Sequence, residues 1–169
     1  MTESKQHQPR IEERTEQPCI VIPIKVTLQE WGKANALVPQ LFGWLAQHNT
    51  EPAGALFFRY YTIGDMDKAF SLEVGVPVKS AIPCNNPIHP STIAGGSYAT
   101  LIHAGHPDRL TQSFDKLQAW AEKQGIEWAI RHEDGEDVWG GRFEFYLTNP
   151  AEQPDPEQWS TEIAWLLQD

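Results

Sequence analysis

The chain has 169 residues, of which 40% are hydrophobic and 21% are charged. A chain of this length and composition buries roughly 70% of its extended surface, which excludes a disordered or fibrous protein. Its 13 basic and 23 acidic residues give a net charge of −10, and no basic cluster is present. Because nucleic-acid binding relies on Lys and Arg that neutralise phosphates, we expect no direct nucleic-acid partner. The same negative field favours a cationic small molecule.

No segment approaches the ~20 apolar residues of a membrane span, and the N-terminus lacks the apolar stretch of a secretion signal. We therefore expect a cytoplasmic protein without a membrane partner. Cys19 and Cys84 form no metal-type pair and are too few for a disulfide scaffold. His103 and His106 have H-x-x-H spacing, which aligns two ligands only on a helix, and this stretch precedes one. With no phosphate-cradling glycine loop either, we expect no metal and no cofactor.

The first predicted element follows a polar N-terminus. Residues 1–9 are polar and end in a proline, so we expect them to be flexible, with a single domain over residues 10–169. Residues 19–26 (CIVIPIKV) are β-branched and apolar, which predicts a strand. Pro23 within it indicates a sheet edge or a bulge, because proline cannot donate to a ladder.

The period of the hydrophobic pattern then changes from two to that of a helix. Asn35 is the predicted N-cap of this helix. Two predicted strands follow, residues 55–61 (ALFFRYY) and 70–78 (FSLEVGVPV), joined by a hairpin loop that contains Gly64 and two aspartates. The helical stripe consists of Leu37, Leu41, Trp44, Leu45 and His48.

A segment rich in Pro and Asn, residues 79–92, reads as a connector to a second half of the chain. A strand is predicted within residues 95–105 (GGSYATLIHAG), followed by a helix with Asp108 as cap and Gly125 as C′ residue. The last two predicted strands are residues 142–147 (RFEFYL) and 160–167 (STEIAWLL). The second helical stripe consists of Leu110, Phe114, Leu117 and Ala121.

The two halves of the chain repeat one pattern, which predicts an α+β fold. The repeat is a strand-helix-strand-strand unit, with half one at about residues 10–78 and half two at about residues 93–169. We expect an antiparallel sheet with helices on one face and a ligand groove between the halves. The aligned positions are Leu41 with Leu117, Trp44 with Trp120, Asn49 with Gly125, Phe57 with Phe143, Tyr60 with Tyr146, and 71–74 (SLEV) with 160–163 (STEI).

The strand RFEFYL contains one acid among bulky residues. Alternation places Phe143, Phe145 and Leu147 on one face, which we expect under the helices, and Arg142, Glu144 and Tyr146 on the other. One interpretation is a solvent-facing Glu144 paired with Arg142 or a lysine. The other is an aromatic cleft with the acid at its floor, because the chain has more aromatic residues than one core needs. A buried unpaired carboxylate costs several kcal/mol, which a ligand would offset.

Several motifs, in this order along the chain, resemble those of the GyrI-like small-molecule-binding family, which is related to the effector-binding domains of AraC- and MerR-type multidrug regulators. The resemblance implies a duplicated α+β fold whose groove has Glu144 on its floor and Tyr146 beside it. The family's G-P-Y is changed here to Gly105, His106 and Pro107, so a tyrosine contact is missing. The motifs are 53–61 (AGALFFRYY), 72–78 (LEVGVPV), 94–100 (AGGSYAT), 103–110 (HAGHPDRL), 143–150 (FEFYLTNP) and 160–167 (STEIAWLL).

Three functions are compatible with these residues. The first is a standalone protein that sequesters or senses hydrophobic small molecules, cationic ones included. We expect no helix-turn-helix in residues 1–34, because this segment is short and acidic. The second is a hydrolase of reactive cyclopropanoid compounds, as in some relatives, with Glu144 as general acid or base. The third is an interaction with a protein partner such as a topoisomerase through residues 133–137 (EDGED). The predicted ligand-binding residues are Glu144, Tyr146, Tyr60, Phe57 and Tyr98.

Two further acids occupy equivalent positions in the repeat. Glu73 and Glu162 each lie in the last strand of their half. We interpret them as pairing or edge-strand charges in preference to ligand contacts.

Overall fold

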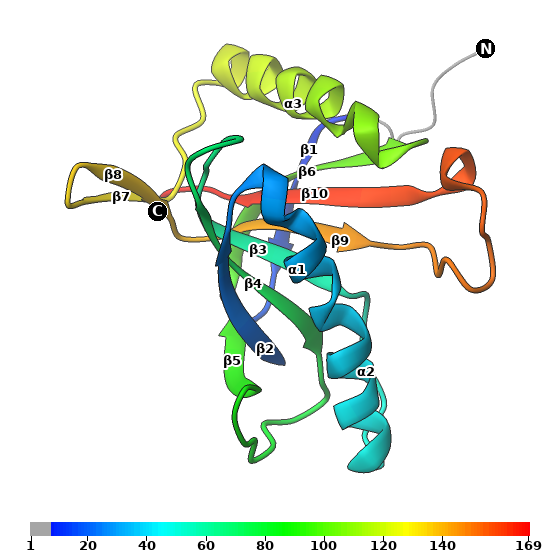
Figure 1. Cartoon of the computed structure of the whole chain (residues 1–169). Helices are drawn as coiled ribbons and strands as arrows, with labels where there is room; N and C mark the ends of the chain where they lie inside the picture. The colour runs from blue at the N-terminus through cyan, green and yellow to red at the C-terminus, as the bar shows by residue number, and fades with distance from the viewer. Residues whose placement is uncertain (1–7) are drawn as a thin grey trace.

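A computed structural model describes residues 8–169, so most of the predicted flexible segment 1–9 lies outside the described residues. The fold is α+β, with a curled antiparallel sheet of eight strands in the order β1-β6-β10-β9-β3-β4-β2-β5 and a separate β7-β8 hairpin (Figure 1). The strands are β1 (Arg10–Arg14), β2 (Gln17–Val26), β3 (Phe57–Thr62), β4 (Phe70–Pro77), β5 (His89–Ile93), β6 (Gly96–Ala104), β7 (Ile130–Glu133), β8 (Glu136–Trp139), β9 (Arg142–Tyr146) and β10 (Ser160–Leu166). The helices are α1 (Trp31–Asn35), α2 (Leu37–Gln47) and α3 (Leu110–Gln124), with 3-10 turns at η2 (Leu28–Glu30), η3 (Pro107–Arg109) and η4 (Pro156–Gln158).

The strand order confirms the predicted duplication. One half runs β2, helices, β3, β4 and the other runs β6, helix, β9, β10, so the sheet reads the same from either end toward its centre. The halves meet at the β3-β9 ladder, where Phe58 is directly opposite Glu144. These two residues are also repeat equivalents, related by the shift that relates Tyr60 to Tyr146. The approximate two-fold relation of the halves therefore passes between Phe58 and Glu144.

Both helices pack through the residues that the repeat predicted. Leu41 in α2 and Leu117 in α3 are fully buried. Helix α3 ends at Gly125 in the left-handed region, with φ of 70°, and the first half has Asn49 at φ of 51° in the equivalent place. Glycine and asparagine are the residues that adopt this conformation at low cost, so the helix-end alignment is confirmed. No helix within residues 8–169 combines the length and apolar character that crossing a bilayer requires.

The two predicted N-caps are wrong. Asn35 is the last residue of α1, and α2 follows after Ala36 with no side-chain cap. At the second helix the cap is His106, whose ring Nδ1 accepts a hydrogen bond from the backbone N–H of Asp108 at 3.0 Å. This cap begins the turn η3, which continues into α3, so the chain starts its helical path two residues before the predicted position.

Strands β1 and β5 were not predicted, and residues 89–92 of the expected connector form most of β5. Strand β1 precedes β2 in the chain but pairs with β6, while β5 precedes β6 but pairs with β2. The β1-β6 and β2-β5 ladders share one antiparallel register: Arg10 is opposite Thr100 in the first, and Val21 is opposite His89 in the second. This exchange joins the two ends of the sheet and curls it. Strand β5 ends before Pro23 of β2, so that proline lies where β2 has β4 as its single neighbour, as the edge interpretation predicted.

Both faces of the central strands are buried, which overturns the predicted facing of RFEFYL. Phe143 and Phe145 lie inside the curl of the sheet, where they pack on Phe57. Glu144 and Tyr146 are on the face that carries the helices. Leu147 lies beyond the end of β9 and is 47% exposed, so it belongs to neither layer.

Candidate functional site

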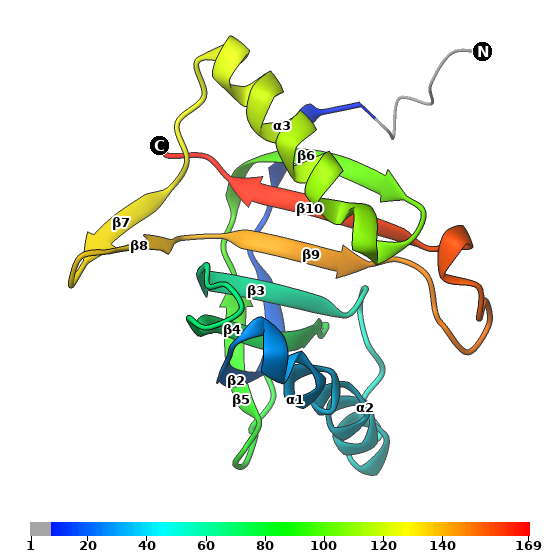
Figure 2. The ribbon, with the colours of Figure 1, turned by 45° about the horizontal axis from the view of Figure 1, so that its top comes forward.

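The acid at the centre of the sheet is buried between the two halves. Strands β9 and β3 lie between helix α3 on one side and helices α1 and α2 on the other (Figure 2). Glu144 is on β9, on the helix-bearing face, and is 7% exposed. Its Oε1 accepts hydrogen bonds from the hydroxyl groups of Tyr60, at 3.1 Å, and Tyr146, at 2.8 Å. The site thus takes one tyrosine from each half.

The other carboxylate oxygen, Glu144 Oε2, has no hydrogen-bond partner among residues 8–169. No fully buried side-chain nitrogen or oxygen in this part of the chain lacks a partner, so Oε2 retains access to solvent. A carboxylate oxygen accepts more than one hydrogen bond. Oε2 of Glu144 is therefore a hydrogen-bond acceptor that is held in place but has no donor in the described chain.

The surroundings of Glu144 shift the pKa of its carboxyl upward. Burial raises the pKa of the carboxyl above its ordinary value of 4.5, opposed by the hydrogen bonds from Tyr146 and Tyr60 and by the charge of Arg142. The same burial raises the pKa of both tyrosine hydroxyls, so these remain hydrogen-bond donors at neutral pH. The balance gives a carboxyl that can bind a cation when ionised or exchange a proton.

Aromatic rings line the first-half side of the acid. The Trp31 ring stacks on Tyr60 with centroids 6.2 Å apart and packs edge-on against Phe70 at 5.3 Å. On the second side, Phe58 meets the Tyr146 ring edge-on at 5.3 Å. Flat apolar walls beside a buried acid are the composition of a site for aromatic or cationic ligands.

Arg142 lies two residues before Glu144, on the same face of β9. Its guanidinium carbon is 4.2 Å from the ring centroid of Trp165, 4.5 Å from that of Trp139 and 5.6 Å from that of Phe114. Burial lowers the pKa of Arg142 to about 10, although the charge of Glu144 raises it. The group is therefore cationic at neutral pH, and the aromatic faces stabilise its charge.

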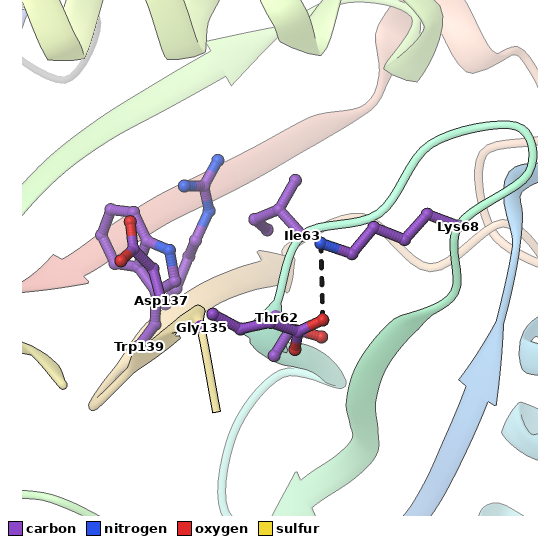
Figure 3. Close-up of a pocket in the computed structure, with 8 residues that line it drawn as sticks. Thr62, Ile63, Lys68, Gly135, Asp137 and Trp139 are labelled. Carbon is purple, nitrogen blue, oxygen red and sulfur yellow. Dashed lines mark ion pairs between the residues drawn. The ribbon is translucent and has the colours of Figure 1, made fainter. Parts of the chain in front are cut away.

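A pocket of about 410 Å³ lies next to Arg142, near the junction between the halves. In Figure 3, Lys68 from the β3-β4 loop lies across the pocket from Asp137 and Trp139 of β8. An ion pair of 3.4 Å joins Lys68 Nζ to Glu136 Oε1. Arg142 lines this pocket, whereas Glu144 does not, so the open space and the buried acid are adjacent but distinct.

The structure brings three of the five predicted ligand-binding residues together: Glu144, Tyr146 and Tyr60. Phe57 and Tyr98 lie on the opposite face of the sheet, where they are 0% and 1% exposed. The Tyr98 hydroxyl donates to the carbonyl of Ala94 at 2.6 Å. Neither side chain lies on the face that carries Glu144.

The acids Glu73 and Glu162 are pairing charges inside the curl, as interpreted from the sequence, and not edge charges. Glu73 pairs with the buried Arg59, and Glu162 accepts from Arg14 at 2.8 Å. Strands β4 and β10 both lie between two neighbours in the sheet. Each half thus contributes one glutamate to an ion pair inside the curl, and the Arg59–Glu73 pair is the more buried of the two.

The histidines of the H-x-x-H motif make hydrogen bonds within the fold. His103 Nδ1 lies 2.7 Å from Ser113 Oγ, and its Nε2 lies 3.0 Å from the carbonyl of His106. Across residues 8–169, no three His, Cys, Asp or Glu side chains are grouped in a way that could hold a metal ion.

Two parts of the site were not found from the sequence. The acidic segment EDGED forms the β7-β8 hairpin, with Asp134 and Gly135 at positive φ of 49° and 79°. An Asp-Gly pair at such a turn is a hairpin signal that the sequence did contain. The aromatic cage of Arg142 had no local signal, because Phe114, Trp139 and Trp165 come from three separate elements.

Comparisons with known proteins agree with this architecture. The family described as the GyrI-like small molecule binding domain matches residues 7–168. No curated protein matches the sequence. Among solved structures, the C-terminal domain of EcmrR is 18% identical with a TM-score of 0.71, over 96% of this chain and 98% of that one. The EcmrR-DNA complex gives 17% identity and a TM-score of 0.76, over 96% of this chain and 57% of EcmrR. The chain thus spans little more than half the length of that protein.

Two further structures share the fold at lower similarity. SAV2435 bound to tetraphenylphosphonium is 10% identical, with a TM-score of 0.60 over 95% of this chain and 94% of that one. A hydrolase from Listeria innocua is 11% identical, with a TM-score of 0.62 over 98% of this chain and 94% of that one. At such identities the likeness concerns the fold.

Proposed function

The chain belongs to the GyrI-like small-molecule-binding family, and we propose that it binds hydrophobic small molecules, cationic ones included, where its two halves meet. The observation that carries the proposal is the buried carboxyl of Glu144, with Oε1 fixed by two tyrosines and Oε2 free of any partner in the described chain. Sequestration or sensing of such compounds is the role we assign to it.

The energetics of Glu144 support a ligand as its missing partner. Removing a carboxylate from water costs several kcal/mol unless a charge or hydrogen bonds compensate it. Two tyrosine hydroxyls supply part of this compensation, and Arg142 supplies charge but no hydrogen bond. A ligand that donates to Oε2, or carries a positive charge beside it, would complete the set.

The aromatic walls support the hydrophobic part of the proposal. Trp31 is half-buried and stacked on Tyr60, which donates to Glu144. Each contact of a cation with an aromatic face contributes roughly 0.5 to 2 kcal/mol. The relative SAV2435, which has the same fold, was solved with tetraphenylphosphonium, a hydrophobic cation. That compound is therefore a suitable first probe.

The test is a calorimetric titration with tetraphenylphosphonium. Glu144→Gln keeps the size and the acceptor of the side chain but removes its charge, so we expect affinity to fall by about tenfold or more. Glu133→Gln removes the same charge from the exposed β7-β8 hairpin and serves as the matched control. Equal affinities of the wild type and Glu144→Gln would refute the role of the acid.

A second function at the same residue is hydrolysis, favoured by the raised pKa of Glu144 and by the hydrolase that shares the fold. A carboxyl with a raised pKa can serve as general acid or base toward a water. The test is turnover of a reactive cyclopropanoid compound by the wild type and by Glu144→Gln. An unchanged rate in the variant would exclude this mechanism.

A further inference from the structure

The guanidinium of Arg142 is a charged group without a direct polar partner. Among residues 8–169 it makes no hydrogen bond and no ion pair, and its closest interactions are with the faces of Trp165 and Trp139. Arginine has five N–H donors in a planar fork. Since no fully buried side-chain nitrogen in this part of the chain lacks a partner, the unused donors of Arg142 keep access to solvent, and Arg142 is one of the residues that line the pocket.

The other charged side chains of this pocket are already paired. Lys68 Nζ lies 3.4 Å from Glu136 Oε1 across its mouth. Asp137 Oδ1 lies 2.6 Å from Nδ1 of His132 on the neighbouring strand β7. Among the charged lining residues, Arg142 is therefore the one whose side chain has neither an ion pair nor a close polar contact with another side chain within residues 8–169. Its repeat equivalent in the first half is Leu56, so the cation belongs to one half alone.

We propose that this pocket is a subsite for an oxyanion, in which Arg142 binds a carboxylate of the ligand by its forked donors and Trp139 supplies a flat wall. Arginine matches a carboxylate with two parallel hydrogen bonds, which adds geometric specificity. The approximately 410 Å³ of the pocket is enough for an aromatic acid.

The ligand class rests on the proposed function. If Glu144 and the Arg142 subsite bind the same ligand, together they define its chemical class. The Cα atoms of residues two apart on a strand lie roughly 7 Å apart, so Glu144 and Arg142 carry an acceptor and a forked donor at neighbouring positions on one face of β9. The ligand that satisfies both is a flat, amphipathic zwitterion, with its cationic or donor group at Glu144 and its acid at Arg142. A purely cationic ligand meets repulsion from Arg142, which already occupies the aromatic cage that would stabilise such a charge.

The test uses two dyes that differ by one group. Rhodamine 110 is a zwitterion with a free carboxylate, and rhodamine 123 is its methyl ester, a cation. Calorimetric titrations compare the wild type with Arg142→Gln, with Arg142→Lys and with Arg131→Gln, which removes an exposed cation from β7 as the matched control. We expect Arg142→Gln to weaken rhodamine 110 by about tenfold and to leave rhodamine 123 unchanged or tighter. Arg142→Lys keeps the charge but loses the forked donors, so its affinity for rhodamine 110 should lie between those of the wild type and Arg142→Gln.

The outcomes separate the two proposals. Equal losses for both dyes in Arg142→Gln would show that Arg142 acts only as a wall, and would overturn the oxyanion subsite while leaving the binding role of Glu144 intact. Should neither dye bind the wild type, the proposed function fails on this pair, and the subsite is tested on its own by NMR. The Nε–H signal of Arg142, assigned by its loss in Arg142→Gln, should then shift saturably with 2-naphthoate and not with 2-naphthamide. No shift with naphthoate, or the same shift with both compounds, overturns the subsite.

Discussion

Tyr60 and Tyr146 occupy equivalent positions in the two halves, and both donate a hydrogen bond to the same oxygen, Oε1 of Glu144. The acid itself has no counterpart, because its repeat equivalent is Phe58, directly opposite on β3. Duplication thus supplies a symmetric pair of donors, and one asymmetric residue converts the junction into a charged site. We expect one ligand per chain for this reason.

Neutralising Glu144 should stabilise the protein at neutral and alkaline pH. Burial raises the pKa of Glu144 above 4.5, so between 4.5 and the raised value the folded chain keeps a proton that the unfolded chain has lost. The free energy of unfolding therefore falls as pH rises through this window, and above it the loss is complete. Glu144→Gln does not titrate and should exceed the wild type there by about 0.5 to 2 kcal/mol.

Urea unfolding at a series of pH values checks this prediction. The difference between the variant and the wild type should vanish below the ordinary pKa of a glutamate, where both side chains are neutral in both states. A wild type that is more stable than Glu144→Gln at neutral pH would contradict the account of an acid kept at a cost in stability.

Removing either tyrosine hydroxyl should raise the pKa of Glu144 further. Both hydrogen bonds favour the ionised carboxylate, and that from Tyr146 has the larger effect. Tyr146→Phe should therefore shift the titration of the Glu144 carboxyl carbon, followed by ¹³C NMR, upward more than Tyr60→Phe does. Tyr61→Phe is the matched control, because that hydroxyl donates to Glu73 on the other face of the sheet. A downward shift in either of the first two variants would count against the assigned contacts.

Breaking the ion pair inside the curl should destabilise the fold without affecting binding. The side chains of Arg59 and Glu73 are 7% and 15% exposed, so Glu73→Gln leaves a buried guanidinium without its counter-charge. Such a loss costs about 3 to 5 kcal/mol. We expect this decrease in the free energy of unfolding and an unchanged affinity for the dyes. Weakened binding in a variant that remains folded would mean that the two faces are coupled.

The end of helix α3 tests the repeat itself. Gly125 has φ of 70°, where a side chain with a β-carbon is strained. Gly125→Ala should lower the free energy of unfolding by about 1 kcal/mol. Gly125→Asn should lower it less, because asparagine occupies the equivalent position at residue 49 with φ of 51°. Equal effects of the two substitutions would argue against equivalent helix ends.

The repeat was predictable because the same residue types recur at equivalent positions of the two halves. Leu41 and Leu117 mark the same point of two helices, and Tyr60 and Tyr146 the same point of two strands. These matches predicted the duplicated unit and its antiparallel sheet, and the family resemblance pointed to Glu144 between the halves. Strands β1 and β5 were not predictable in this way, since they are short, contain charges or proline, and depend on pairing with the other half.

The facing of β9 could not be inferred from alternation. A strand with one wet face places its apolar residues inward, but β9 is covered on both faces. Phe143 and Phe145 fill the inside of the curl, and the helix face is packed around Glu144 and its tyrosines. The more apolar face was therefore the wrong guide to where the helices lie. The cage around Arg142 was equally hidden, because its rings meet only in the folded chain.

The most direct test of the site is to locate a bound ligand by its own scattering. Tetraphenylarsonium has the shape and charge of tetraphenylphosphonium and carries an anomalous scatterer, so a crystal of its complex reveals where the cation lies. We predict one arsenic peak per chain, on the helix-bearing face between β3 and β9, beside Oε2 of Glu144. An arsenic peak confined to the outer surface, away from Glu144, would contradict the account.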